Sequence, residues 1–447
     1  MNLIDAAGHR VSGATPESLA LYGQAANELL CLVDDPVATV DRALAASPAM
    51  TMAHLLKAWL HLLGTEPAGI AVAADCCAAA AALPADERER AHLAAAQALA
   101  AGRWLEAGQR LEDLSLRWPR DSLALQAGHQ IDFFRGDSRM LRDRIARALP
   151  AWDAAIPGYH GVLGMHAFGL EETGDYAQAE AQGRRAVEMQ PRDSWAWHAV
   201  AHVAEMRHAP REGIAWLRPS RATWSAGSFL GVHNTWHLAL FELELDGHDE
   251  ALRLYDESIG GSGLPQVLDL VDASAMLWRL QLRGVDVGAR WGAVADRWAE
   301  VGGAGQYAFN DLHAMLAYVG ADRQREQQVV LAAMQEALAS DVDNAVFTRE
   351  VGLPAVQAVH ALGRGDAARA VQLLRPVRSH AHRFGGSHAQ RDLVDLTLIE
   401  AAQRAGDAPL AAGLAAERRA LRPHSALAQR LAARWPVAAG PHAGVAA

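Results

Sequence analysis

The sequence predicts an all-α fold, an α-solenoid of about nine to ten helix pairs wound into a right-handed superhelix. Ala, Leu, Arg and Glu, which favour helices, dominate the chain, and alternating runs of β-branched residues are nearly absent. A glycine turn followed by an amphipathic helix recurs along the chain. The steps between these turns range from 34 to 45 residues, which is the period of helical-hairpin repeats.

The recurring turn divides each expected helix pair. It is centred on Gly64, Gly102, Gly136, Gly174, His208, Gly247, Gly284, Gly320, Gly365 and Gly406. Glycine favours the left-handed conformation that ends the first helix, and the Asp or Arg/Glu cluster after it opens the second helix. Proline after the second helix, as in "EMQPRDSWAW", ends the pair.

Composition limits the classes of partner and compartment. Lys and Arg number 41 against 52 Asp and Glu, giving a net charge of −11. Because no Lys/Arg run interrupts this acidic balance, we expect no nucleic acid partner and no membrane partner. Three cysteines, an odd and sparse set, favour a reducing, cytoplasmic location. The N-terminus lacks a signal-peptide pattern, and the chain lacks a run of 18 apolar residues.

We expect one superhelical domain over residues 1–435 and a flexible C-terminal tail over 436–447, where small residues, Pro and Gly gather. The chain contains no GxSxG motif, no P-loop and no GxGxxG after a strand. We therefore expect no cofactor, and nothing in the sequence predicts a nucleotide site.

Several segments resemble a known family. The stretch "GDYAQAEAQGRRAVEMQPRDSWAWHAVAHVAEM" resembles a tetratricopeptide repeat (TPR) unit. Through "YHGVLGMHAFGLEETGDYAQAE", "VHNTWHLALFELELDG", "LDLVDASAMLWRL" and "AFNDLHAMLAYVGA", most of the chain is similar to the tetratricopeptide repeat protein 38 family. The resemblance implies a TPR-like superhelix of helix pairs, but it implies no catalytic assignment.

The helix before each glycine turn should line the concave face of such a solenoid. These inner helices carry histidines, carboxylates and indoles, whereas a peptide-binding groove would favour Asn, Lys and Arg. The candidate catalytic residues are His198, His202, His233, His237, Asp272, Asp311 and His313. The candidate substrate-binding residues are His166, Trp197, Asn234, Trp236, Asn310, His388 and Arg391.

The stretch "HAVAHVAEM" places His198 and His202 on one helix face, with Glu205 three residues further on. This spacing suits either a divalent metal or two imidazoles hydrogen-bonded to neighbouring helices. We expect no tightly bound metal, because the sequence offers no clear set of three ligands.

The other polar groups have two interpretations each. His233, Asn234 and His237 suit either an oriented base or ligand, or the capped start of a helix. Asp311 beside His313 suits either a carboxylate that fixes a histidine tautomer, or a helix cap.

The stretch "GGSHAQRD" begins a helix with Ser387. It suits either an anionic substrate group held by His388 and Arg391, or a plain serine cap.

Two functional hypotheses follow. The first is an enzyme that uses histidine acid/base chemistry, hydrolysis or elimination, on a small-molecule ligand in the inner cavity. Its general base would be His202 or His237, with Asp272 or Asp311 setting the tautomer. The alternative is a TPR scaffold that binds a protein or peptide in its concave groove, and a non-catalytic small-molecule binder is a third reading. An enclosed pocket would favour the first hypothesis and an open channel the second; self-association into a homo-oligomer stays open.

Overall fold

The protein is an all-α TPR-like solenoid, as the sequence predicted. The computed structural model describes residues 3–261 and 263–435, so the tail predicted for 436–447 lies outside the described residues. Among the described residues the only sheet is a small antiparallel hairpin at the N-terminus, in which β1 (Leu3–Ile4) pairs with β2 (Arg10–Val11).

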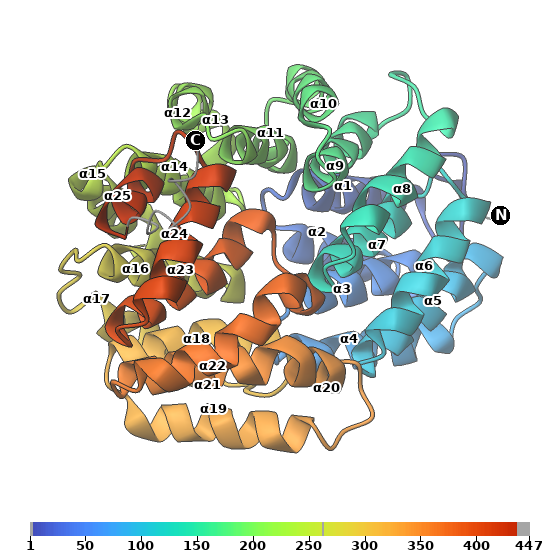
Figure 1. Cartoon of the computed structure of the whole chain (residues 1–447). Helices are drawn as coiled ribbons and strands as arrows, with labels where there is room; N and C mark the ends of the chain where they lie inside the picture. The colour runs from blue at the N-terminus through green and yellow to red at the C-terminus, as the bar shows by residue number, and fades with distance from the viewer. Residues whose placement is uncertain (1–2, 262, 436–447) are drawn as a thin grey trace, which may run out of the picture.

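Successive helices pair along the chain (Figure 1). The first four pairs are α1 (Pro16–Cys31) with α2 (Pro36–Ala46), α3 (Thr51–Leu63) with α4 (Gly69–Ala81), α5 (Glu87–Ala100) with α6 (Trp104–Arg117), and α7 (Ser122–Phe134) with α8 (Ser138–Ala148). The next four are α9 (Tyr159–Glu172) with α10 (Tyr176–Met189), α11 (Ser194–Met206) with α12 (Pro210–Leu217), α14 (Gly231–Glu244) with α15 (His248–Leu254), and α16 (Val267–Leu282) with α17 (Arg290–Val301).

The last pairs complete the coil. They are α18 (Ala308–Gly320) with α19 (Gln324–Ala337), α21 (Leu353–Gly363) with α22 (Ala367–Val377), and α23 (His388–Arg404) with α24 (Ala408–Leu421). Shorter pieces connect or flank the pairs: α13 (Arg221–Ser225), α20 (Asn344–Phe347), α25 (Ala426–Arg434), η1 (Leu149–Ala151), η2 (Tyr255–Ile259), η3 (Thr348–Gly352) and η4 (Arg378–Phe384).

Each of the ten predicted turns lies at the end of the first helix of a pair, but glycine does not always take the left-handed conformation there. At four turns that conformation falls on Thr65, His208, Asp246 or Asp322. A further pair, α1 with α2, precedes the first predicted turn. Its turn takes the left-handed conformation at Leu32 and Asp34, so the glycine pattern missed it.

The coil closes on itself, because helices far apart in sequence meet across it. The Asp343 N–H donates to the Gly102 carbonyl at 3.1 Å, and the Tyr307 hydroxyl donates to the Phe134 carbonyl at 2.9 Å. The C-terminal helices, orange to red in Figure 1, fold back beside the green helices α11 and α14. There the Arg422 guanidinium donates to Glu205 at 3.0 Å.

Helix α23 covers the inner face of the solenoid. It contacts α11, α16 and α21. Its first N–H, from His388, donates to the Glu172 carboxylate at the end of α9, at 3.1 Å. Further along, Thr397 accepts a hydrogen bond from the Trp278 indole of α16 at 3.0 Å. Helix α23 therefore covers the concave face that would be exposed if the solenoid had an open groove.

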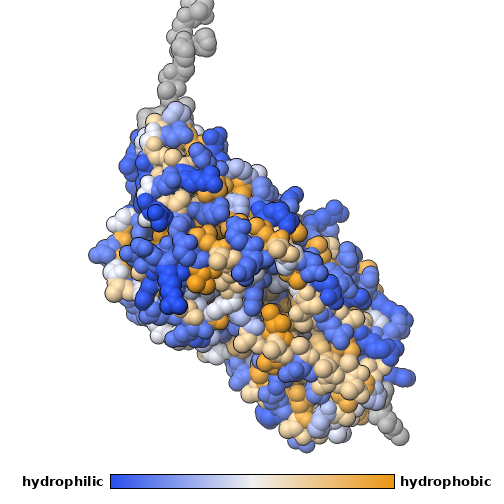
Figure 2. Space-filling view, turned by 90° about the horizontal axis from the view of Figure 1, so that it is seen from below, coloured by the Kyte–Doolittle hydropathy of each residue, from blue (hydrophilic) through white to orange (hydrophobic). Residues whose placement is uncertain are grey.

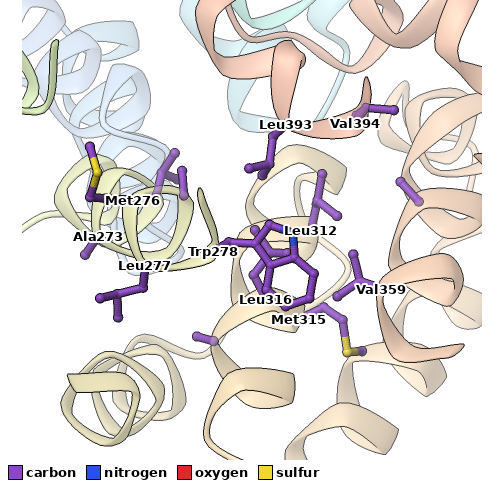
Figure 3. Packing of buried hydrophobic residues seen from close by; sticks show 14 of the residues in the cluster. Ala273, Met276, Leu277, Trp278, Leu312, Met315, Leu316, Val359, Leu393 and Val394 are labelled. Carbon is purple, nitrogen blue, oxygen red and sulfur yellow. The ribbon is translucent and has the colours of Figure 1, made fainter. Parts of the chain in front are cut away.

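The core of the C-terminal half packs around this helix. Figure 3 shows Trp278 of α16, Leu312 and Leu316 of α18 and Leu393 of α23 in one hydrophobic cluster. Because α16, α18 and α23 all contribute to it, this cluster fixes the position of α23 relative to α16 and α18. Among the residues that the structure describes, no helix is both long and apolar enough to cross a membrane.

A buried charge network also holds α23 against α16 and α24. Asp392 of α23 accepts hydrogen bonds from Arg418 of α24 at 2.8 Å and from Arg279 of α16 at 3.3 Å. Both arginines are almost wholly buried. Burial alone would raise the pKa of Asp392, but Arg418, Arg422 and Arg279 outweigh it and hold that pKa well below its usual range.

Removal of this carboxylate is expected to destabilise the protein strongly. Asp392→Ala leaves buried guanidinium groups unpaired, which should lower the free energy of unfolding by about 3–5 kcal/mol. Asp296→Ala removes the partner of an exposed pair with Arg323 and should cost at most about 1 kcal/mol. Urea unfolding of both variants checks the difference, and equal losses would contradict the assignment.

The contribution of Asp392 should also depend on pH in one direction. Because its folded-state pKa is depressed, its stabilisation is fully present above the unfolded value of about 3.9. It is lost as the pH falls through the lower folded-state pKa. The stability difference between wild type and Asp392→Ala should therefore be constant from neutral pH to about pH 5 and shrink below about pH 4.

Candidate active site

Four imidazoles meet between two neighbouring inner helices. His198 and His202 come from α11, and His233 and His237 come from α14. Each pair is spaced four residues apart, so its two rings share one helix face. One ring nitrogen from each histidine lies within 4.8 Å of the others, and all four side chains are buried. The sequence predicted each face; the structure brings the two faces together.

A chain of hydrogen bonds orients part of this histidine cluster. The Asp272 carboxylate of α16 lies 2.8 Å and 3.0 Å from Nδ1 of His233, which therefore donates its proton to Asp272. Nε2 of His233 lies 3.0 Å from Nε2 of His198. The pairing of Asp272 with an imidazole was expected, but its partner is His233, not His202 or His237.

The remaining ring nitrogens of the cluster have no hydrogen-bond partner among the described residues. They are Nδ1 of His198 and both nitrogens of His202 and His237. The nearest carboxylate to His202 is Glu171 of α9, whose Oε2 lies 3.5 Å from Nδ1 of His202. Buried polar atoms without partners each lower the free energy of unfolding by about 1–3 kcal/mol. A purely structural role for this cluster would therefore leave the protein destabilised.

Burial keeps His198, His202 and His237 neutral. Burial, together with the neighbouring histidines, lowers the pKa of His198 and His237 well below the usual range. Burial also lowers the pKa of His202 to about 4. At neutral pH the rings therefore keep lone pairs that can accept a proton or bind a cation.

Aromatic rings enclose the cluster. Phe168 of α9 stacks on His198 with ring centres 5.4 Å apart, and the Trp195 ring lies 4.9 Å from His198. On the other side, Trp236 stacks on His233 at 5.5 Å. These rings fix the imidazoles and lower the local polarity. Trp236 thus packs against the cluster and does not line the cavity.

A cavity of about 570 Å³ reaches the cluster. His198 and His233 form part of its wall, and other parts come from α1, α3, α7, α16, α18 and α23. Most lining residues are apolar or aromatic, including Trp195, Tyr307 and Phe309. On the face in Figure 2, hydrophobic residues, in orange, gather around a hollow. A cavity of this size suits a small organic molecule.

Lysine and arginine are absent from the described residues that line this cavity. The polar lining side chains are His61, Thr65, Glu66, Gln130, His198, His233, Gln266, Asn310 and Gln390. Burial raises the pKa of Glu66, whose Oε1 accepts the Val267 N–H at 3.1 Å. The lining therefore favours neutral ligands over anions.

The predicted anion site at the start of α23 holds a carboxylate of the chain itself. Ser387 caps the helix, and Glu172 accepts the His388 N–H. The Arg391 guanidinium also lies 3.5 Å from Glu172. Burial opposes ionisation of Glu172, but Arg391 and His388 outweigh it and lower its pKa. The prediction that His388 and Arg391 bind an anionic substrate is thus corrected, because Glu172 fills that role.

Asp311 and His313 do not join the histidine cluster. Asp311 lines a separate cavity of about 430 Å³ and accepts the Gly305 N–H at 2.9 Å. Burial raises its pKa to about 7. Nδ1 of His313 lies 2.8 Å from the carbonyl of Phe309, one turn back on the same helix. Asn310 lines both cavities and donates to Thr65 at 3.2 Å.

Three further candidates serve packing. His166 points to the outer helix α10, where its Nδ1 lies 2.7 Å from Gln182. Trp197 donates to the Pro191 carbonyl at 2.9 Å, away from the cluster. Asn234 donates to the Ser194 carbonyl at 3.3 Å and ties α14 to α11.

Glu205, considered with His198 and His202 as a ligand, instead pairs with Arg422.

Two sets of side chains offer ligand atoms for a metal. One is the histidine cluster, and the other consists of Glu171, Glu172 and His202. Sequence reasoning missed Glu171 and Glu172, although the adjacent acids in "LEETGD" at the end of an inner helix were a visible signal. Burial, reinforced by Glu172, raises the pKa of Glu171 well above its usual range.

Comparison with known proteins adds little beyond the fold. No family model matches the chain. A human IFIT1 dimer with PPP-AAAA is 12% identical, with 94% of this chain and 93% of that chain covered and a TM-score of 0.42. The TPR domain of P58(IPK) is 14% identical, with 88% and 98% covered and a TM-score of 0.22. These are similarities to helical-repeat chains, and they carry no function to this chain.

The unpartnered imidazoles should make the cluster a source of instability. In a buffer with chelator, His237→Leu removes two buried nitrogens without partners and should raise the free energy of unfolding by about 1 kcal/mol. His233→Leu instead leaves Asp272 buried without a partner and should lower it by about 2 kcal/mol. Chemical unfolding measures both, and destabilisation by both changes would show that the cluster is ordinary structural packing.

Proposed function

We propose that this protein is an enzyme that performs acid/base chemistry on a small, neutral organic molecule in the 570 Å³ cavity. The observation that carries the proposal is the chain of hydrogen bonds from Asp272 through His233 to His198, which ends at the cavity wall. It supports hydrolysis or elimination, in which an oriented imidazole takes a proton and later returns it.

The hydrogen-bond partners of His233 and His198 indicate the tautomers that we propose for these two rings. Because Asp272 accepts the Nδ1 proton of His233, the tautomer that we propose for His233 holds its lone pair at Nε2. Nε2 of His198 must then donate to it across 3.0 Å. This leaves Nδ1 of His198 unprotonated and without a hydrogen-bond partner among the described residues. The geometry therefore favours His198 as general base over His202 and His237, neither of which lines the cavity.

Hydrolysis of an ester shows how the atoms would balance. Nδ1 of His198 accepts a proton from water while the water oxygen attacks the acyl carbon. The bond from the acyl carbon to the leaving oxygen breaks, and His198 returns the proton to that oxygen. His233 and Asp272 are positioning residues, since they hold the tautomer of His198 without touching the substrate.

We rank the alternative, a scaffold that binds a protein or peptide, second because of the packing of α23. An extended peptide needs an open concave face, and here α23 packs against α11 and α16 on that face. What remains is a cavity whose size and apolar lining suit a compact ligand.

We further propose that the chain belongs to the tetratricopeptide repeat protein 38 family. The support is the set of sequence motifs described above, which include the stretches that carry the four clustered histidines.

Chromogenic esters test the proposed chemistry. The purified protein should hydrolyse at least one of p-nitrophenyl acetate, p-nitrophenyl butyrate and 1-naphthyl acetate above the buffer rate. His198→Gln should lower kcat/KM by about 10²–10⁴-fold, because the general base is lost. Asp272→Asn should lower kcat with little change in KM, since it disturbs only the tautomer.

Two matched variants separate chemistry from binding. His382→Gln changes an exposed histidine outside the cavity lining and should keep the wild-type rate. Leu60→Trp narrows the cavity from α3 and should raise KM while the histidine cluster stays intact. Near-UV circular dichroism confirms folding of each variant. Equal rates for wild type and folded His198→Gln would contradict the proposal.

The absence of a nucleic acid partner remains a prediction. We expect no binding of the oligonucleotide PPP-AAAA, because the chain carries a net charge of −11 and the described cavity lining lacks Lys and Arg. Fluorescence anisotropy at about 0.15 M ionic strength measures this. Binding that weakens steeply as salt rises would overturn the exclusion.

A further inference from the structure

The histidine cluster contains more ligand atoms than acid/base catalysis uses. A general base and its positioning residue account for His198 and His233. His202 and His237 add two fully buried rings whose four nitrogens have no partner among the described residues. Their rings lie 4.5 Å apart, centre to centre, and 4.4–5.2 Å from the ring of His198.

We infer that His198, His202, His233 and His237 bind one divalent transition metal ion. The inference goes beyond the proposed function, because ion binding requires no substrate, and it replaces the sequence-based expectation that no metal is bound. Neutral imidazole is a preferred ligand for Zn²⁺, Cu²⁺, Fe²⁺, Co²⁺ and Ni²⁺. Ca²⁺ and Mg²⁺, which select oxygen ligands, do not suit an all-nitrogen set.

Carboxyl groups behind two of the histidines indicate which ring nitrogens face the ion. Nδ1 of His233 is engaged by Asp272, so its Nε2 is the free ligand atom. Oε2 of Glu171 lies 3.5 Å from Nδ1 of His202 without a hydrogen bond, and a small movement that formed this bond would leave Nε2 of His202 for the ion. A carboxylate behind a ligating histidine fixes the ring and strengthens its donor atom, an arrangement common in metal sites.

The spacing requires only small ring movements. Four nitrogens at about 2.1 Å from one ion in tetrahedral geometry lie about 3.4 Å apart. The Nε2 atoms of His198 and His233 are already 3.0 Å apart, and the four ligand atoms fall within 4.8 Å of one another. Ion binding would replace the His198–His233 hydrogen bond by joint ligation.

The charges around the cluster also suit a dication. Four neutral imidazoles bring no charge, whereas the buried carboxyl groups of Asp272 and Glu171 stand directly behind two of the ligands. Both oxygens of Glu171 lack hydrogen-bond partners among the described residues. A dication at the cluster would place a positive charge beside both of these buried acidic side chains and would favour their ionised forms.

One side of the proposed metal site faces the 570 Å³ cavity. His198 and His233 line the 570 Å³ cavity, whereas His202 and His237 do not. An ion among the four rings is thus reached from the cavity side, where it can take a further ligand from a bound molecule or a water. In the loaded protein, such a water would take over the proton transfer assigned to His198.

Cobalt titration tests the inference without any substrate. The full-length protein is dialysed against a chelator, freed of the chelator, and titrated with CoCl2 alone. We expect visible absorption bands that saturate at one Co²⁺ per chain, with an intensity that reports the coordination number. Elemental analysis of protein purified without chelator should find close to one transition metal ion per chain.

Variants locate the site. His237→Leu, which should fold at least as stably as wild type, should abolish the cobalt bands. Asp272→Asn removes the carboxylate that holds Nδ1 of His233 and should weaken Co²⁺ binding by about 10–100-fold. Two controls, Glu172→Gln in the carboxylate group and His382→Gln at an exposed histidine, should bind one Co²⁺ as wild type does.

Three results would overturn the inference. They are absence of stoichiometric Co²⁺ binding by the folded wild type, full binding by His237→Leu, and loss of binding in folded Glu172→Gln with retention in His237→Leu. The last would assign the ion to Glu171, Glu172 and His202 instead. Ester hydrolysis by protein that binds no metal would leave the proposed function intact, and metal binding without hydrolysis would leave this inference intact.

Discussion

The packing of α23 into the interior of the solenoid is the constraint on which the rest of the structure depends. Helical-repeat chains bury each pair against its neighbours and leave a concave face. Here α23 covers that face. Glu172 accepts the first N–H of α23, and Asp392 of α23 accepts hydrogen bonds from Arg279 and Arg418. These buried polar contacts fix where the helix lies, and the remaining space becomes a cavity with histidines in its wall.

The repeat architecture was predictable because its signals are local. Glycine turns and the 34–45-residue period follow from the geometry of one helix pair, and the spacing of His198 and His202 assigns both to one helix face. The path of the coil is not local. No pattern within α14 or α16 indicates that Asp272 bonds His233, or that α23 returns to α9, so the partners of Asp272, His388 and Arg391 were misjudged.

The same limit explains which parts of the site were missed. Glu171 ends an inner helix where an acidic residue before a turn is ordinary, and its approach to His202 depends on the packing of α9 against α11. Asp311 and His313 fell on the correct type of helix, yet they bond to Gly305 and Phe309 close by in sequence. Residue type and spacing identified the histidines, and tertiary packing decided which of them meet.

The closing contact between α9 and α23 also has a consequence for biosynthesis. Translation proceeds from the N-terminus, and domains generally begin to fold as they emerge. Both helices that carry the histidine cluster, α11 and α14, are made long before α23. Helix α23 is therefore available to cover the inner side of α11 and α14 only after both of them have been synthesised. The part of the cavity wall that α23 contributes, at Gln390, is thus the last part to be synthesised.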